Sequence, residues 1–249
     1  TGHLAQALMR ALLESKTVQP NQIYGTNRTQ GKLDKVRDLN GIIALKNNEE
    51  LVETCDVVFI TVKPQDLQEA MEPLGSLFGN HQIVVSLAAG ISLKTLSSLL
   101  PSVRTPIRVM INTPVMVRRA VIGCCSADKS KQIPSLLEAL FAPLGTVIVA
   151  EEGEAFEALT VACAGGPGFI FELMQYWVEW LEEHHFDSDV AKKMTLETFL
   201  GTAMLADRQS TLSIVDLQNQ VVSKKGITQA GLDSIRELEI ERALRISFE

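Results

Sequence analysis

The pattern of apolar residues changes once along this chain, near residue 151, and that change most constrains the fold. Up to about Ala150, short apolar runs alternate with amphipathic segments of helical period. Such alternation is typical of a mostly parallel sheet with helices on both faces. After Glu151 only helical spacing remains. The sequence therefore predicts an α/β fold, with a Rossmann-type domain over residues 1–150 and an all-helical domain over residues 151–249.

Seven short runs are predicted to be strands. They are Gln22–Thr26, Gly41–Leu45, Val57–Thr61, Ile83–Ser86, Arg108–Met110, Ala120–Cys125 and Thr146–Ala150. Two long helices are predicted after them, one opened by Gly166-Pro167 and one from Asp189 to Asp207. The first has an apolar stripe and the second has small residues that allow close helix packing. An intrachain bundle or a subunit interface would explain both, and we favour the interface.

Composition narrows the possible partners and the compartment. The net charge of −7 argues against a nucleic-acid surface, and no apolar run approaches the roughly 20 residues that span a bilayer. The four histidines do not pair with carboxylates at metal-ligand spacing, so no metal site is expected. Four cysteines lack CxxC spacing. We therefore expect buried, reduced thiols and a cytoplasmic location.

The first residues are similar to the second half of a Gly-x-Gly-x-x-Gly/Ala turn, which cradles a pyrophosphate. Gly2 would let the backbone approach the phosphates, and Ala5 would let a helix pack on a strand. His3 and Leu4 open that helix and are expected to face the cofactor with Gly2. The strand and first glycine of such a turn are expected upstream of Thr1.

The loop after Gln22–Thr26, which is the second strand if the expected upstream strand is counted, bears on the choice of cofactor. An NAD site usually places an acidic residue there for the ribose 2′-hydroxyl, whereas an NADP site offers an arginine. This chain has Asn27, Arg28 and Thr29. The pattern favours the 2′-phosphate of NADP, with NADPH preferred over NADH, although a solvated loop arginine would look the same.

Three further strand ends carry small or polar residues. A flat ligand can lie against the backbone at such ends. The residues expected to bind the cofactor there are Val62, Lys63, Pro64, Ala88, Ala89, Gly90, Asn112, Thr113 and Pro114.

With these segments in order, the chain resembles the pyrroline-5-carboxylate reductase family over nearly its whole length. The segments that carry the resemblance are TGHLAQAL, TNRT, VKPQ, SLAAGIS, RVMINTP, CAGGPGF and VSKKGITQAGL. The resemblance implies NADP-dependent reduction of 1-pyrroline-5-carboxylate, a cyclic imine, to L-proline, the final step of proline biosynthesis. It also implies a homo-oligomer, either a dimer or an assembly of dimers, built on the helical domain. Neither nucleic acid nor membrane is an expected partner.

The resemblance also places the substrate in a loop of the helical domain. Ser223, Gly226, Ile227 and Thr228 would surround its carboxylate, and Thr228 with Asn112 would be the catalytic residues. Lys224 and Lys225 stand where the family commonly has proline and glycine. If that glycine had a positive φ, Lys225 would carry a strain of roughly 1 kcal/mol. Alternatively, the two lysines would attract the carboxylate.

Two other functions stay open. A diverged paralogue would bind NADP but act weakly or in regulation. An NADP-dependent dehydrogenase would act on a small hydroxy acid, but the glycine-rich helix with spaced lysine and asparagine that such enzymes use is missing here.

Overall fold

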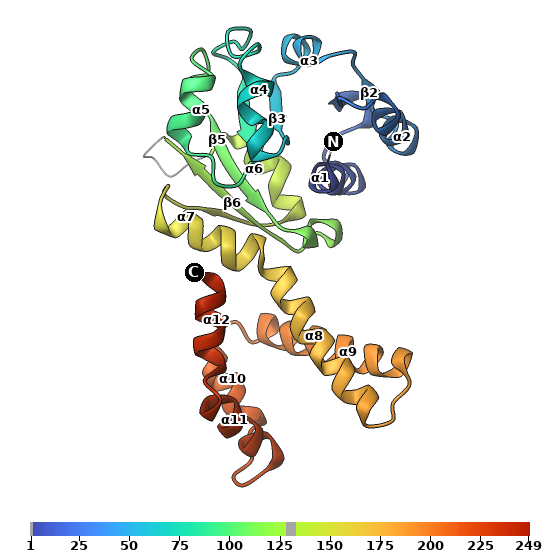
Figure 1. Cartoon of the computed structure of the whole chain (residues 1–249), viewed down its shortest axis with the longest axis vertical. Helices are drawn as coiled ribbons and strands as arrows, with labels where there is room; N and C mark the ends of the chain where they lie inside the picture. The colour runs from blue at the N-terminus through green and yellow to red at the C-terminus, as the bar shows by residue number, and fades with distance from the viewer. Residues whose placement is uncertain (1, 128–132) are drawn as a thin grey trace. The chain divides into compact units, whose positions relative to one another are not determined.

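The computed structural model of the protein describes residues 2–127 and 133–249. The chain divides into two compact units, Thr1–Pro167 and Gly168–Glu249. Figure 1 shows all the labelled strands in the first unit and only helices in the second. The prediction of an α/β Rossmann-type domain followed by a helical domain is confirmed at this level.

The strands of the first unit form two sheets, which share no strand pairing in the described part of the chain. β1 (Tyr24–Gly25) pairs with β2 (Ile43–Ala44). The larger sheet has the order β3-β4-β5-β6-β7. Its members are β3 (Val57–Ile60), β4 (Ile83–Ser86), β5 (Ile107–Ile111), β6 (Ala120–Ser126) and β7 (Gly145–Val149). All seven predicted strands are confirmed, with ends shifted by a few residues.

The sheet departs from parallel order at one pairing. β5 and β6 run antiparallel, whereas the other strand pairs are parallel. The chain passes from β5 to β6 through the short 3-10 helix η3 (Thr113–Val117), which leaves no room for a crossover helix. A direct reversal of chain direction is the result.

Helices cover both faces of the larger sheet, because its strands are apolar on both sides (Figure 1). The helices of this unit are α1 (His3–Glu14), α2 (Gln30–Asn40), α3 (Asn48–Thr54), α4 (Leu67–Met71), α5 (Leu93–Leu99), α6 (Ser135–Phe141) and α7 (Glu154–Leu159). One buried cluster includes side chains from α1 and α6, and the other includes side chains from α4, α5 and α7. Cys124 belongs to the first cluster and Cys125 to the second, so the expectation of buried thiols is confirmed for this adjacent pair, whereas Cys55 and Cys163 are only half-buried.

The second unit consists of helices joined by short connections. They are α8 (Gly166–Glu183), α9 (Ser188–Arg208), α10 (Ile214–Val221), α11 (Ile227–Glu237) and α12 (Ile240–Phe248). The two long helices predicted from sequence correspond to α8 and α9. Within this unit Trp177 on α8 packs edge-on against Phe199 on α9, with 5.4 Å between ring centroids.

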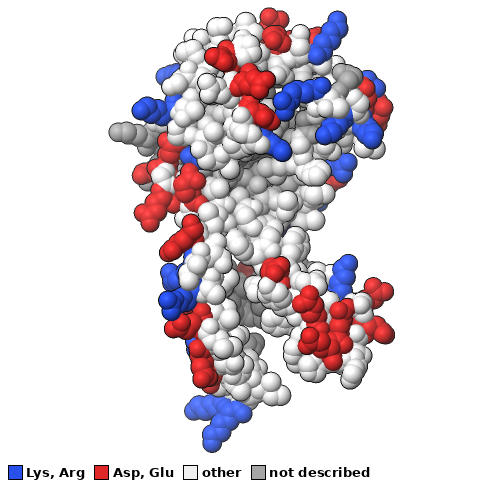
Figure 2. All heavy atoms as spheres, in the orientation of Figure 1, with Lys and Arg blue, Asp and Glu red and all other residues white. Residues whose placement is uncertain are grey.

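One long helical stretch leads into the second unit. A π-helical turn, η5 (Thr160–Ala164), joins α7 to α8, so that one helical stretch runs from Glu154 to Glu183. By length and composition this stretch could cross a membrane, although no single apolar run in the sequence suggests it. Large apolar side chains on it are exposed, among them Ile170, Trp177 and Trp180. Uncharged side chains likewise cover much of the second unit on the face shown in Figure 2.

The end of the first unit lies beyond the last strand. α7 packs on the sheet through Phe156, which is fully buried with Val84 and Met110. The compact unit therefore extends to Pro167 and includes α7 and η5, whereas the sequence pattern changes at residue 151.

Candidate functional site

Three of the predicted cofactor segments meet at one edge of the larger sheet. β3, β4 and β5 are adjacent and parallel, so the residues after each strand lie at the same carboxyl edge. The structure thus brings together Val62–Pro64, Ala88–Gly90 and Asn112–Pro114. In open α/β sheets, ligands bind at this edge.

The turn after β4 exposes backbone at the edge. Ser86 is buried, and its hydroxyl accepts a hydrogen bond from the backbone N–H of Ala88 at 3.3 Å. Ala89 and Gly90 are exposed, and Gly90 has a φ of +72°. A Cβ built on Gly90 has no described atom within 4 Å. A ligand can therefore approach this backbone, which a side chain at residue 90 would obstruct.

The start of α1 suits an anion. Gly2 is the N-cap residue, and the first turn of the helix carries no acidic side chain in the described structure. A Cβ on Gly2 also has no described neighbour within 4 Å. The first N–H groups of a helix have no partner within it, and the helix dipole adds positive potential there. His3 is exposed on this turn and Leu4 is half-buried.

The loop after β1 holds its arginine in an ion pair that the sequence did not suggest. Asn27 Oδ1 accepts from the backbone N–H of Thr29 at 2.9 Å, which shapes the loop. Arg28 Nη2 lies 2.9 Å from Asp66 Oδ2. Asp66 ends the 3-10 helix η2 (Pro64–Asp66), directly after Lys63 at the carboxyl edge of β3.

The amide of Asn112 is occupied by backbone groups. Nδ2 donates to the carbonyl of Cys163 at 3.1 Å, and Oδ1 accepts from the N–H of Val121 at 3.0 Å. Asn112 is buried and so joins the end of β5 to β6 and to the π-helical turn. Its amide is placed to hold the edge in shape, and π-helical turns are frequent at functional sites. A chemical role for Asn112 stays a prediction.

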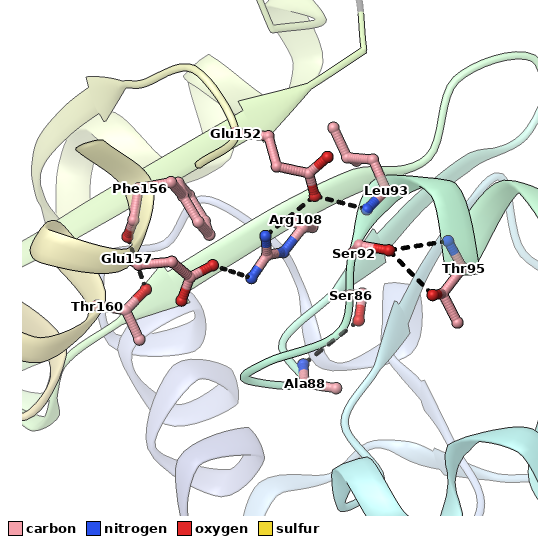
Figure 3. A network of polar contacts seen from close by, with 10 residues as sticks. All are labelled: Ser86, Ala88, Ser92, Leu93, Thr95, Arg108, Glu152, Phe156, Glu157 and Thr160. Atoms are coloured by element: carbon pink, nitrogen blue, oxygen red, sulfur yellow. Dashed lines mark hydrogen bonds and ion pairs between the residues drawn. The ribbon is translucent and has the colours of Figure 1, made fainter. Parts of the chain in front are cut away.

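A buried arginine lies near the turn after β4 (Figure 3). Arg108 in β5 lies 3.1 Å from Glu152 Oε1 and 3.0 Å from Glu157 Oε1. Its guanidinium carbon stands 4.6 Å from the centre of the Phe156 ring. The sequence analysis did not single out this network, yet an arginine inside an apolar strand was the available signal.

The predicted substrate loop lies in the second unit and is described there by itself. The N–H of Gly226 donates to the carbonyl of Ser223 at 2.9 Å and closes a turn before α11. A Cβ on Gly226 would lie 2.1 Å from the Ser223 hydroxyl oxygen. Ile227 and Thr228 are exposed in the first turn of α11. Lys225 has a φ of +61°, the condition under which strain was expected.

Comparisons with known proteins match both units. A model described as NADP oxidoreductase, coenzyme F420-dependent, matches residues 1–90, and one described as pyrroline-5-carboxylate reductase dimerisation matches residues 153–248. Pyrroline-5-carboxylate reductase 2 of Bacillus subtilis is 26% identical over 98% of this chain and 87% of its own length. The pyrroline-5-carboxylate reductase of Pseudomonas aeruginosa is 29% identical over 98% and 90%.

Solved structures of proteins with the same name have a similar fold. A pyrroline-5-carboxylate reductase from Coxiella burnetii has a TM-score of 0.87 at 26% identity, covering 99% of this chain and 92% of that one. The Plasmodium falciparum pyrroline carboxylate reductase with NADP bound also has a TM-score of 0.87, at 18% identity, covering 99% and 91%.

The chain resembles pyrroline-5-carboxylate reductases over nearly its whole length. It is an oxidoreductase whose first unit binds a pyridine nucleotide. The residues at the edge fit such a ligand, since Gly2 and Gly90 leave open space and the start of α1 offers N–H groups without an acidic side chain. The dimerisation match spans α7 to α12, and it supports a homo-oligomer, because most of the exposed large apolar side chains lie in this region. Among the described residues no cluster of three metal-ligating side chains occurs.

Proposed function

We propose that the protein reduces 1-pyrroline-5-carboxylate to L-proline with NADPH, the final step of proline biosynthesis. The observation that carries the proposal is the match to relatives of that name over 98% of the chain, from the nucleotide edge through the substrate loop. Identities of 26% and 29% support an oxidoreductase. The particular substrate, 1-pyrroline-5-carboxylate, is what we infer.

The reaction needs positioning more than acid–base chemistry. The carbon of the C=N bond gains a hydride and the nitrogen gains a proton, and a protonated imine already accepts hydride readily. When bound, the nicotinamide supplies that hydride. The chain's part is to hold both reactants in line. The first turn of α11 would offer the N–H groups of Ile227 and Thr228 to the substrate carboxylate, and the Thr228 hydroxyl would lie near the ring nitrogen.

We further propose that Arg28 determines the preference for NADPH over NADH. Its exposed guanidinium would pair with the 2′-phosphate of NADPH, which NADH lacks. A charge-assisted pair is worth about 1.5–3 kcal/mol, or roughly ten- to a hundredfold in affinity. Arg28→Ala should therefore remove most of any preference for NADPH. Equal affinity of the parent protein for both cofactors would exclude this role.

Compartment and assembly complete the proposal. All four cysteines, which lie within the described residues, are free, and this supports a reducing compartment such as the cytoplasm. The exposed apolar helices support a homodimer or an assembly of dimers.

NADPH oxidation in the presence of 1-pyrroline-5-carboxylate tests the function. A parallel panel of 2-hydroxy acids with NADP⁺ tests the dehydrogenase alternative. If the protein turns over the imine and none of the hydroxy acids, the proposal is supported. If it oxidises a hydroxy acid instead, the dehydrogenase alternative takes its place. Tight NADPH binding without turnover of either class would indicate a diverged paralogue.

A further inference from the structure

The Arg28–Asp66 ion pair joins the loop after β1 to the segment after β3, 38 residues along the chain. Nη2 and Oδ2 are 2.9 Å apart, and the side chains are 79% and 30% exposed. A pair this open to solvent is easily broken and adds little to stability. The pair is important because it includes Arg28, the residue that is expected to select the cofactor.

In the described structure the carboxylate of Asp66 makes no capping hydrogen bond to the helix that follows it. Asp66 is the last residue of η2 and directly precedes α4, and its own backbone is helical, with φ of −95° and ψ of −5°, so the two helices follow each other without a side-chain cap. Its Oδ2 accepts from Arg28 instead. The carboxylate is thus directed at the loop that follows β1.

A 2′-phosphate and the Asp66 carboxylate would use the same guanidinium. A ribose 2′-hydroxyl is uncharged, whereas a phosphate group carries close to two negative charges at neutral pH. To bind the phosphate, Arg28 must leave or share Asp66, and that carboxylate then repels the phosphate. A nucleotide without the 2′-phosphate meets neither cost.

We propose that Asp66 is a specificity-determining residue that narrows the preference for NADPH over NADH by holding Arg28. This inference rests on the proposed function, in which Arg28 contacts the 2′-phosphate. It adds the residue that opposes that contact.

Calorimetric titration with 2′,5′-ADP and 5′-AMP tests the inference, because the two nucleotides differ only in the 2′-phosphate. In Asp66→Asn the side chain keeps its size and loses its charge. Its affinity for 2′,5′-ADP should rise about two- to fivefold, the range that an exposed ion pair accounts for, while its affinity for 5′-AMP stays unchanged. Asp38→Asn is the matched control. It removes an exposed carboxylate 2.9 Å from Arg37 on α2 and should change neither affinity.

The double variant Arg28→Ala/Asp66→Asn should gain less 2′,5′-ADP affinity over Arg28→Ala than Asp66→Asn gains over the parent protein, because without Arg28 only the direct repulsion by Asp66 remains to be removed. If Asp66→Asn does not raise the 2′,5′-ADP affinity while Arg28→Ala lowers it, the inference is wrong and the phosphate contact stands. If Arg28→Ala leaves that affinity unchanged, the contact itself fails and the inference with it. An equal gain for 5′-AMP, or the same gain in Asp38→Asn, would also overturn the role of Asp66.

Discussion

Arg108 in β5 and Glu152, between β7 and α7, are joined by an ion pair of 3.1 Å in which only the arginine is fully buried. The same Oε1 atom of Glu152 accepts from the backbone N–H of Leu93 at 2.6 Å (Figure 3). One carboxylate oxygen therefore ties β5 to the first residue of α5. Because α5 closely follows the exposed Ala89-Gly90 turn, this network holds that turn in place at the carboxyl edge of the larger sheet.

Glu152→Ala should lower the free energy of unfolding by about 1–3 kcal/mol, because it leaves the Leu93 N–H without this acceptor and Arg108 with one carboxylate. Glu152→Gln retains an acceptor oxygen and should cost less. Urea unfolding followed by circular dichroism measures both. Glu154→Ala, an exposed change in the first turn of α7, is the control. Equal costs for Glu152→Ala and Glu154→Ala would show that the network contributes nothing.

Gly226→Val should abolish imine reduction and leave NADPH affinity unchanged. A Cβ at residue 226 would lie 2.1 Å from the Ser223 hydroxyl oxygen, and displacing the substrate by even about 1 Å can reduce the rate about a hundredfold. Gly231→Ala, on the same helix with open space around it, is the control and should gain about 0.5–1 kcal/mol in stability. Steady-state kinetics and NADPH titration separate the two effects. Full activity of Gly226→Val would remove this turn from the substrate site.

Lys225→Gly should raise stability by up to about 1 kcal/mol, because Lys225 has a φ of +61° that glycine adopts without strain. Lys16, at the end of α1, has a φ of +58°, so Lys16→Gly should give a similar gain far from the substrate loop along the chain. Thermal unfolding compares them. The imine-reduction activity of the variants then shows whether the two lysines are neutral substitutions or take part in the reaction. If the change to Pro-Gly at Lys224-Lys225 destroys imine reduction while Lys16→Gly preserves it, the lysines take part in catalysis.

Stability should fall as pH rises above about 9, through the two buried thiols of β6. Burial raises the pKa of Cys124 from 9.0 to about 12 and that of Cys125 to about 11. The thiols stay neutral in the folded protein while the unfolded chain ionises, so their stabilisation is complete below pH 9.0 and is lost above it. Each thiol should account for about 1 kcal/mol between roughly pH 8 and 10. In Cys124→Ala/Cys125→Ala the decline measured by urea unfolding should be shallower. An unchanged slope would mean that other groups cause the decline.

The protein should be an assembly of at least two chains of 27.3 kDa at micromolar concentration. The dimerisation match spans helices whose apolar side chains are exposed in the single chain, and water contact with such surface is unfavourable. Light scattering measures the particle mass. Ile170→Glu puts a charge on α8 and should shift the population toward single chains. A monodisperse single chain of the parent protein would contradict the interface.

Local sequence pattern was sufficient to predict the strands and the two long helices. The seven apolar runs became β1 to β7, and the helix opened by Gly166-Pro167 became α8. Periodicity reports which side of an element is buried, and that depends on residues a few positions apart. The antiparallel step from β5 to β6 was not predicted, because an apolar run has the same pattern in either direction.

The sequence by itself determined the order of elements and the segments that share a sheet edge. The positive φ of Lys225 was only a condition that followed from the family resemblance, and the structure supplied it. Tertiary structure alone decided which partners the site residues have. Asp66 faces Arg28 across 38 residues, and the Cys163 carbonyl receives the Asn112 amide across 51. Such contacts arise when separate elements pack, and their partners leave no periodic trace along the chain. The segments that form the sheet edge were therefore predictable from the sequence, whereas the contacts between their side chains depend on the folded chain.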